Sequence, residues 1–330
     1  MRICVVGAGA IGGLFAVRLA GTGAEVAVVA RGPHLAAMRE RGLKLLEGGA
    51  ERVVRVRATD RIEELGPQDL VVLAVKAHQL APVAPQVPAL LGPGTVVLTA
   101  QNGIPWWYFF GHGGAHEGTR LESVDPGGAI AASLDASRVV GSIVYPAAEI
   151  AAPGVIRHVE GNRVSLGEPG GTETERVRAI AELLRGAGFK ARVTTDLRSE
   201  IWVKLWGNCT FNPLSALTRA TLAGICRYPP TRELAASMMR EAREIGEKLG
   251  VRFPVSLDKR IAGAESVGEH RTSMLQDVEA GRPMELEALL GSVVELGRIT
   301  GTPTHTLSAV YACAGLLART LADTGPHRRA

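Results

Sequence analysis

Aromatic residues are scarce in this sequence, at 4% of 330 residues. The interior must therefore be built mainly from Ala, Val, Leu and Gly, as is common in α/β proteins. Hydrophobic residues still amount to 46% of the chain and charged residues to 21%, a balance typical of a soluble globular protein with a substantial core. A chain of this length favours two domains over one.

Cysteine is also rare, with only four residues, at positions 4, 209, 226 and 313. No two of them have the spacing of a metal site or a redox motif, and no cluster of His and Cys suggests a metal ion, so we expect none. Scattered, unpaired cysteines are typical of a reducing compartment, and we expect a cytoplasmic location.

Long apolar runs and a strong charge imbalance are missing as well. No stretch of about 18 apolar residues lacks a breaker, which argues against a membrane span, and the glycine-interrupted start does not resemble a signal peptide. Basic residues number 37 and acidic residues 33, for a net charge of +4, which is too balanced for a nucleic-acid partner recognised by electrostatics alone. The small positive excess suits an anionic small molecule.

The first 196 residues alternate between strand-like and helix-like segments. Strands are expected at residues 2–6, 25–30, 53–56, 70–75 and 95–98, with a helix at 14–19. Closely spaced strands at residues 139–145, 155–158 and 163–166 predict an antiparallel part of the same sheet. This order favours an α/β fold, with a doubly wound parallel sheet of the Rossmann type over residues 1–196.

Residues 197–330 carry almost no strand pattern and predict a domain made only of helices. Ser199 is the expected cap of a helix that runs through Lys204 and Asn208, and Thr231 the expected cap of the next. Two more helices are expected, at residues 284–299 and 306–321. No internal repeat or low-complexity segment interrupts this arrangement.

A glycine-rich motif follows the first strand and opens the first helix. It reads Gly7-Ala8-Gly9-Ala10-Ile11-Gly12, the G-x-G-x-x-G pattern of dinucleotide-binding proteins. Gly7 permits the tight turn, Gly9 lets the backbone approach a pyrophosphate, and Gly12 lets helix and strand pack closely. The N–H groups and dipole of the helix N-terminus favour phosphate there. A tight turn without a ligand is the alternative.

The residue after the second strand distinguishes the two nicotinamide cofactors. NAD-binding proteins usually place an Asp or Glu there to hold the ribose 2′-hydroxyl, but this strand is followed by Arg31. A guanidinium can bind the 2′-phosphate that a carboxylate would repel, so the sequence predicts NADPH. Lys76, at the carboxyl end of a later strand, is a second candidate for the cofactor phosphate. Either side chain could instead be an ordinary surface residue.

A polar stripe marks the first helix of the second domain. Lys204, Asn208 and Asn212 are spaced four residues apart and share one helix face, whereas their neighbours Trp202 and Trp206 are apolar enough to be buried. Asparagine is unfavourable inside a helix and costly when buried without partners. The stripe therefore indicates a binding face, with a solvated surface as the alternative.

The same segment resembles the signature of the ketopantoate reductase family, in which a helix carries a lysine, then Asn-Cys, then Asn-Pro-Leu. Three more motifs keep the family's order along essentially the whole chain. The matching segments are Trp202-Val-Lys204-Leu-Trp-Gly-Asn208-Cys209, Asn212-Pro213-Leu214, Gln101-Asn102-Gly103, Ser273-Met274-Leu275-Gln276-Asp277 and Gly281-Arg282-Pro283-Met284-Glu285.

The resemblance implies roles for these residues and a second domain like the helical domain of 6-phosphogluconate dehydrogenase. Lys204 would be the general acid for carbonyl reduction, and Glu285 would bond the substrate hydroxyl near the nicotinamide ribose. Asn102, which would also lie at the cofactor, would hold the substrate together with Asn208, Asn212 and Ser273. The implied reaction is NADPH-dependent reduction of 2-dehydropantoate, a small anionic 2-oxo acid, to (R)-pantoate.

Some segments depart from the family pattern. Leu286-Glu287-Ala288 stand where an Asp and an aromatic usually follow the glutamate, and His270-Arg271-Thr272 precede Ser273 where an asparagine is common. These changes leave the cofactor and the reaction type intact, and they leave open reduction of another 2-oxo acid or an imine. An NADP-binding protein without catalysis is a second alternative, against which Lys204 and Glu285 argue. The run Trp106-Trp107-Tyr108-Phe109-Phe110, within the loop expected over residues 104–128, predicts a lid or, equally, a contact in a homodimer.

Overall fold

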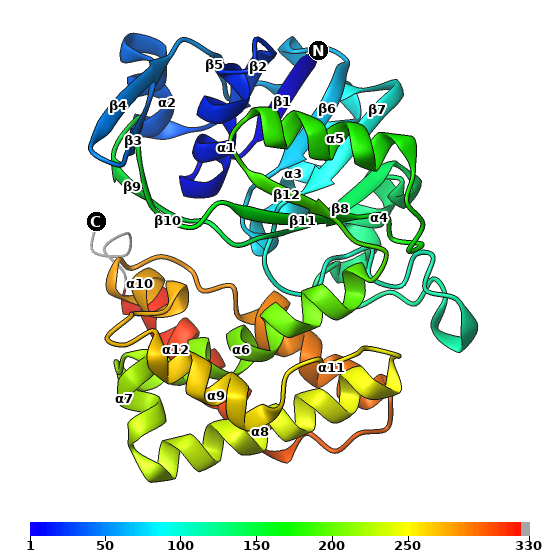
Figure 1. The fold of residues 1–330 in the computed structure, drawn as a ribbon, viewed down its shortest axis with the longest axis vertical. Helices are drawn as coiled ribbons and strands as arrows, with labels where there is room; N and C mark the ends of the chain where they lie inside the picture. The colour runs from blue at the N-terminus through cyan, green and yellow to red at the C-terminus, as the bar shows by residue number, and fades with distance from the viewer. Residues whose placement is uncertain (325–330) are drawn as a thin grey trace. The chain divides into compact units, whose positions relative to one another are not determined.

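The computed structural model describes residues 1–324. The chain divides into two compact units, each with its own internal contacts. Unit 1 comprises residues 1–102 and 106–197, and unit 2 comprises residues 103–105 and the chain from Arg198 onward. From Arg198 onward the described chain forms helices and no strands, and Figure 1 shows the two kinds of structure.

Unit 1 is built on an eight-stranded sheet with the strand order β12-β11-β8-β7-β6-β1-β2-β5. Neighbouring strands are parallel except β11, which runs antiparallel to β8. The predicted parallel sheet with a later antiparallel part is therefore confirmed. The strands are β1 Arg2–Val6, β2 Glu25–Val29, β5 Arg57–Thr59, β6 Gln68–Leu73, β7 Leu91–Thr99, β8 Val139–Val144, β11 Arg163–Gly167 and β12 Lys190–Val193.

Apolar strands and helix faces form the core of unit 1. Helix α1 is buried along almost its whole length, and its Phe15 ring packs on Phe189 at a centroid distance of 4.6 Å. The helices are α1 Ala10–Ala20, α2 Gly32–Arg41, α3 Leu80–Val83, α4 Ala129–Ser133 and α5 Glu175–Gly186. Short 3-10 helices are η1 Ile62–Glu64, η2 Ala77–Gln79, η3 Ala84–Leu90, η4 Gly114–His116, η5 Pro126–Gly128 and η6 Ala136–Arg138.

A second, four-stranded sheet in unit 1 was not expected from the sequence. Its strands, in the order β4-β3-β10-β9, are β4 Ala50–Val54, β3 Leu43–Glu47, β10 Val155–Glu160 and β9 Ala147–Ala152. The predictions that residues 53–56 and 155–158 belong to the main sheet are therefore wrong, since both segments contribute to this small sheet. The small sheet packs on α1 instead, where Gly13 leaves room for Ile156: a Cβ at Gly13 would lie 2.6 Å from the Ile156 Cγ1 atom.

The aromatic run after the Asn-Gly turn lies in the expected loop, and most of it is buried. Trp107, Tyr108 and Phe109 are each at most 3% exposed, whereas Phe110 is 41% exposed. The Trp107 ring fills space that Gly141 on β8 leaves open, since a Cβ there would lie 2.6 Å from it. Burial of apolar area thus explains these three rings as part of the core of unit 1.

The described part of unit 2 contains helices and no strands, as predicted. The helices are α6 Leu197–Thr218, α7 Leu222–Arg227, α8 Pro229–Lys248, α9 Leu257–Ser266, α10 Ser273–Glu279, the π-helix η7 Glu287–Gly291, α11 Ser292–Ile299 and α12 His305–Thr324. The helix predicted over residues 284–299 begins only at residue 286, and it consists mainly of a π-helical part followed by an α-helical part. Within residues 1–324, no helix has the length and apolar character that crossing a membrane requires.

Two predicted helix caps are wrong for a shared reason: each helix begins before the residue chosen as its cap. Helix α8 starts at Pro229, because prolines fit the first turn, where backbone N–H groups have no helical partner. The Thr231 hydroxyl instead donates to the carbonyl of Ile225 at 2.7 Å. Ser199 lies inside the first turn of α6 and accepts a hydrogen bond from the Arg252 N–H at 2.9 Å.

Candidate active site

The glycine-rich turn connects β1 to α1 in the predicted way. Gly7 has φ +96°, a conformation that favours glycine, and the N–H groups of Gly7 and Ala8 both donate to the Val29 carbonyl, at 3.1 and 3.2 Å. A Cβ at Gly7 would lie 2.6 Å from Cγ1 of Val75. Gly7 is therefore held between the ends of β1, β2 and β6, and a side chain larger than hydrogen does not fit at this position.

Gly9 and Gly12 differ in what surrounds them, and the difference indicates a ligand. A Cβ at Gly12 would overlap the Gly7 carbonyl oxygen and lie 3.0 Å from the Ala74 Cβ, whereas a Cβ at Gly9 would meet nothing within 4 Å. Gly12 thus serves internal packing, and Gly9 keeps a space open. Gly9 precedes the first turn of α1, where Ala10 and Ile11 lie and no acidic side chain occurs, as an anion at this N-terminus requires.

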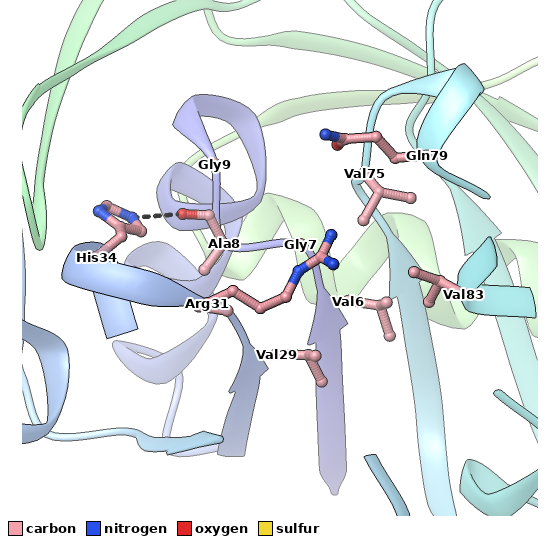
Figure 2. A pocket seen from close by; sticks show the side chains of 11 residues that line it. Val6, Gly7, Ala8, Gly9, Val29, Arg31, His34, Val75, Gln79 and Val83 are labelled. Atoms are coloured by element: carbon pink, nitrogen blue, oxygen red, sulfur yellow. Dashed lines mark hydrogen bonds between the residues drawn. The ribbon is translucent and has the colours of Figure 1, made fainter. Parts of the chain in front are cut away.

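A pocket in unit 1 adjoins the turn (Figure 2). Its lining residues are Val6, Gly7, Ala8, Gly9, Val29, Ala30, Arg31, His34, Val75, Gln79 and Val83. Arg31 is exposed and precedes α2, and no acid occurs among these lining residues of the described chain. The pocket therefore combines a positive side chain with backbone N–H groups, which fits a phosphate-bearing dinucleotide.

Five of the predicted cofactor residues in unit 1 do not line this pocket: Ala10, Ile11, Gly12, Lys76 and Asn102. Lys76 is partly buried and precedes η2, directly after the lining residue Val75, and Asn102 follows the end of β7. His34 and Gln79 do line it, and sequence reasoning missed both. Their position shortly after Arg31 and Lys76, at the carboxyl ends of β2 and β6, was the available signal.

Helix α6 presents the predicted lysine from an apolar setting. Lys204 is partly exposed, but Trp202, Leu205 and Trp206 beside it are at most 2% exposed. Burial lowers the pKa of Lys204 from 10.5 to about 8, and the nearby negative charge of Glu285 opposes this effect. The structure therefore brings Lys204 and Glu285 together, and it gives the lysine a pKa suited to proton transfer near neutral pH.

The other two residues of the polar stripe are Asn208 and Asn212, and Asn212 contacts Ser273 of the second helical motif. Asn212 is 6% exposed, and its Nδ2 atom donates to the Ser273 hydroxyl across a long contact of 3.5 Å. Asn208 is partly exposed and lies one turn before Asn212 on α6. Four predicted substrate residues of unit 2 thus stand on neighbouring helices, with Ser273 as the first residue of α10.

The segment after Asn102 is hydrogen-bonded to the π-helix that follows Glu285. The Ile104 N–H donates to the Ala288 carbonyl at 3.0 Å, and a Cβ at Gly103, which has φ +89°, would lie 2.6 Å from the Ala288 carbonyl carbon. Short π-helical segments occur frequently at functional sites. Here the segment joins two sequence motifs that lie far apart along the chain.

Two buried donors on either side of Asn102 have no hydrogen-bond partner among the described residues. They are the Nε2 atom of Gln101 and the Nε1 atom of Trp106. Because buried donors are nearly always satisfied, these two atoms indicate a place where a water molecule or an acceptor of a ligand is expected.

The sheet order, the glycine-rich turn and the lysine-bearing helix together define an oxidoreductase with a Rossmann fold. Comparison with known proteins narrows the class. The model of the family "Ketopantoate reductase PanE/ApbA" matches residues 3–171, and the model of its C-terminal domain matches residues 196–318. This chain belongs to the ketopantoate reductase family.

Individual relatives agree with this assignment. A 2-dehydropantoate 2-reductase of Mesorhizobium japonicum is 58% identical over 96% of this chain and 98% of its own length. The crystal structure of a putative ketopantoate reductase from Ralstonia solanacearum is 42% identical, covers 97% of this chain and 98% of its own, and has a TM-score of 0.93. A PanE/ApbA family ketopantoate reductase from Ralstonia eutropha is 26% identical, with coverages of 98% and 100% and a TM-score of 0.84.

Proposed function

We propose that this protein reduces 2-dehydropantoate to (R)-pantoate with NADPH, a step of pantothenate biosynthesis. The observation that carries the proposal is the lysine of lowered pKa on α6, placed beside Glu285. The 58% identical relative named 2-dehydropantoate 2-reductase supports the choice of substrate.

Lys204 is the proposed proton donor. Bound NADPH would supply the hydride, and negative charge would develop on the substrate's carbonyl oxygen as the hydride is transferred. An ammonium group at that oxygen stabilises the charge and donates its proton. With a pKa of about 8, Lys204 is mostly protonated at neutral pH and still gives up its proton readily.

The remaining polar residues are proposed to hold the substrate. Asn208, Asn212 and Ser273 offer donors that suit a carboxylate and a hydroxyl, and Asn102 is proposed to contact both substrate and cofactor. Glu285 is proposed to accept a hydrogen bond from the substrate hydroxyl and to lie near the nicotinamide ribose. These groups contribute orientation, which holds the carbonyl in place for reaction.

The cofactor is proposed to bind unit 1, so that residues 1–196 form an NADP-binding domain and residues 197–330 a substrate and catalytic domain. Gly7, Ala8, Gly9, Ala10, Ile11 and Gly12 would hold the pyrophosphate, and Arg31 the 2′-phosphate, with Lys76 as a second cation. The open space at Gly9 and the lack of an acid in the described pocket lining fit this group. All four cysteines are free, which fits a cytoplasmic location.

The experiment is to follow the absorbance of NADPH with 2-dehydropantoate and with a panel of other 2-oxo acids and imines. The expected result is the highest kcat/KM for 2-dehydropantoate, with NADPH preferred over NADH. A higher kcat/KM for another compound would identify that compound as the substrate. No turnover with any compound would reject the proposed function. The solution mass of the same preparation tests whether the protein is a homodimer.

A further inference from the structure

His34 connects the glycine-rich turn to the small sheet of unit 1. Its Nε2 atom lies 2.7 Å from the Ala8 carbonyl oxygen, and its Nδ1 atom lies 2.9 Å from the Gly154 amide nitrogen. Figure 2 shows the first of these contacts at the edge of the pocket. A carbonyl oxygen can only accept and a backbone N–H can only donate. The neutral imidazole with its proton on Nε2 is therefore the form that satisfies both partners.

The contact with Ala8 sets the direction of the next N–H group. The Ala8 carbonyl and the Gly9 N–H belong to one planar peptide unit, and residues 1–324 contain no cis peptide bond. In a trans peptide the carbonyl and the N–H point in opposite directions. A carbonyl held toward His34 therefore turns the Gly9 N–H away from it, at the residue whose Cβ position is open space.

The imidazole is itself fixed by the small sheet. Gly154 lies in the turn between β9 and β10, and its carbonyl accepts the Lys44 N–H of β3 at 2.9 Å. A Cβ on Gly154, which has φ +76°, would lie 3.0 Å from the Ala37 Cβ of α2. The small sheet, α2 and the glycine-rich turn thus meet at one histidine.

We propose that His34 is a positioning residue for the cofactor: by holding the Ala8 carbonyl, it aims the Gly9 N–H at the pyrophosphate. The proposal rests on dinucleotide binding in the proposed function. It does not depend on which carbonyl compound the enzyme reduces, and it assigns the unexpected second sheet a part in cofactor affinity.

Two variants with amide side chains test the two hydrogen bonds of His34 separately, because each variant keeps only one of them. In His34→Gln the amide reaches the position of Nε2 and keeps a donor for Ala8, whereas in His34→Asn it is too short to do so and keeps only an acceptor for Gly154. Dissociation constants for NADPH and NADH, measured by isothermal titration calorimetry without substrate, are compared with those of the wild type. Leu35→Ala, which creates a cavity at the adjacent buried position on α2, controls for loss of stability alone.

His34→Asn is expected to weaken both cofactors by about tenfold, as the loss of one hydrogen bond implies, while kcat at saturating NADPH stays close to wild type. His34→Gln is expected to remain within about threefold of the wild-type affinity, because its donor is retained. Leu35→Ala is expected to melt at a lower temperature but to bind both cofactors normally.

Three results would overturn the proposal. Unchanged affinity in His34→Asn would show that the Ala8 contact does not matter for binding. A loss for NADPH alone would indicate a direct contact between His34 and the 2′-phosphate. An equal loss of cofactor affinity in Leu35→Ala would show that lowered stability alone explains the effect of His34→Asn. Normal cofactor binding without turnover of 2-dehydropantoate would count against the proposed substrate and leave the role of His34 intact.

Discussion

Replacing Lys204 by Met tests whether the lysine proposed for catalysis on α6 lowers the stability of the protein. The folded-state pKa of about 8 lies below the ordinary value of 10.5, so folding is penalised while the lysine carries its charge. At about 1.4 kcal/mol per pKa unit, the penalty is up to about 3 kcal/mol, and partial exposure of the side chain reduces it. Methionine has a similar length and no charge, so Lys204→Met should be more stable than the wild type at pH 7.

The sign of the pH dependence follows from which state binds the proton. Below pH 8 the lysine is charged in both the folded and the unfolded chain, and the full penalty is present. Between pH 8 and 10.5 the unfolded chain keeps its proton while the folded protein releases it, so the stability of the wild type rises with pH. The stability advantage of Lys204→Met should therefore shrink as the pH rises through this window.

The Lys204→Met substitution should lower the catalytic activity although it raises the stability at pH 7. Loss of the proton donor should lower kcat by roughly 10² to 10⁴, and the wild-type kcat/KM should fall as the pH rises above about 8. Glu285→Gln should move that alkaline limb to lower pH, because the carboxylate raises the lysine pKa. Glu287→Gln is the matched control, since Glu287 accepts hydrogen bonds from Tyr311 instead.

The measurements are urea unfolding at pH 7 and 10 and the pH profile of kcat/KM. Near-normal kcat in folded Lys204→Met would remove the proposed proton donor. An alkaline limb near pH 10 in the wild type, together with no gain in stability at pH 7, would show that burial does not perturb this lysine.

Three further predictions concern the cofactor and the packing around the site. Arg31→Ala should weaken NADPH binding by roughly ten- to a hundredfold, as a lost charge-assisted contact implies, and leave NADH binding nearly unchanged; equal affinity of the wild type for both cofactors would contradict this. Gly103→Ala should lower the free energy of unfolding by about 2 kcal/mol, because of the positive φ and the nearby Ala288 carbonyl; an unchanged Tm would refute the reasoning. Trp107→Ala should cost about 3–5 kcal/mol by opening a cavity beside Gly141, whereas an exposed lid would leave Tm unchanged.

Elements with a strong local signal were predictable from the sequence. The strand of residues 2–6 and the glycine-rich turn after it were found because apolar runs and glycine spacing report buried strands and tight turns directly. The polar stripe on α6 was found because helical periodicity survives in three residues spaced four apart. In each case a few neighbouring residues carry the information.

The small sheet was missed because its signal is not local. The segment that forms β9 reads Ala-Ala-Glu-Ile-Ala-Ala, without the clear alternation that identifies a half-buried strand. Its pairing with β10, and the parallel pairing of β10 with β3 more than one hundred residues away, depend on packing against α1. The position of His34 after β2 was a local signal, but its contacts with Ala8 and Gly154 could not be predicted, because these partners lie far from it along the chain.

The candidate catalytic residues lie beside local features that are unfavourable for the stability of the fold. A lysine lies among buried tryptophans on α6, Pro213 interrupts the backbone N–H series of the same helix, and the turn after Glu285 is π-helical rather than α-helical. Each feature lowers stability when it is considered alone. A sequence selected only for folding would replace Lys204 with an apolar residue and Pro213 with a residue that donates a hydrogen bond. Their occurrence together, on helices whose other residues pack well, supports the proposed site for proton transfer over a solvated helix face.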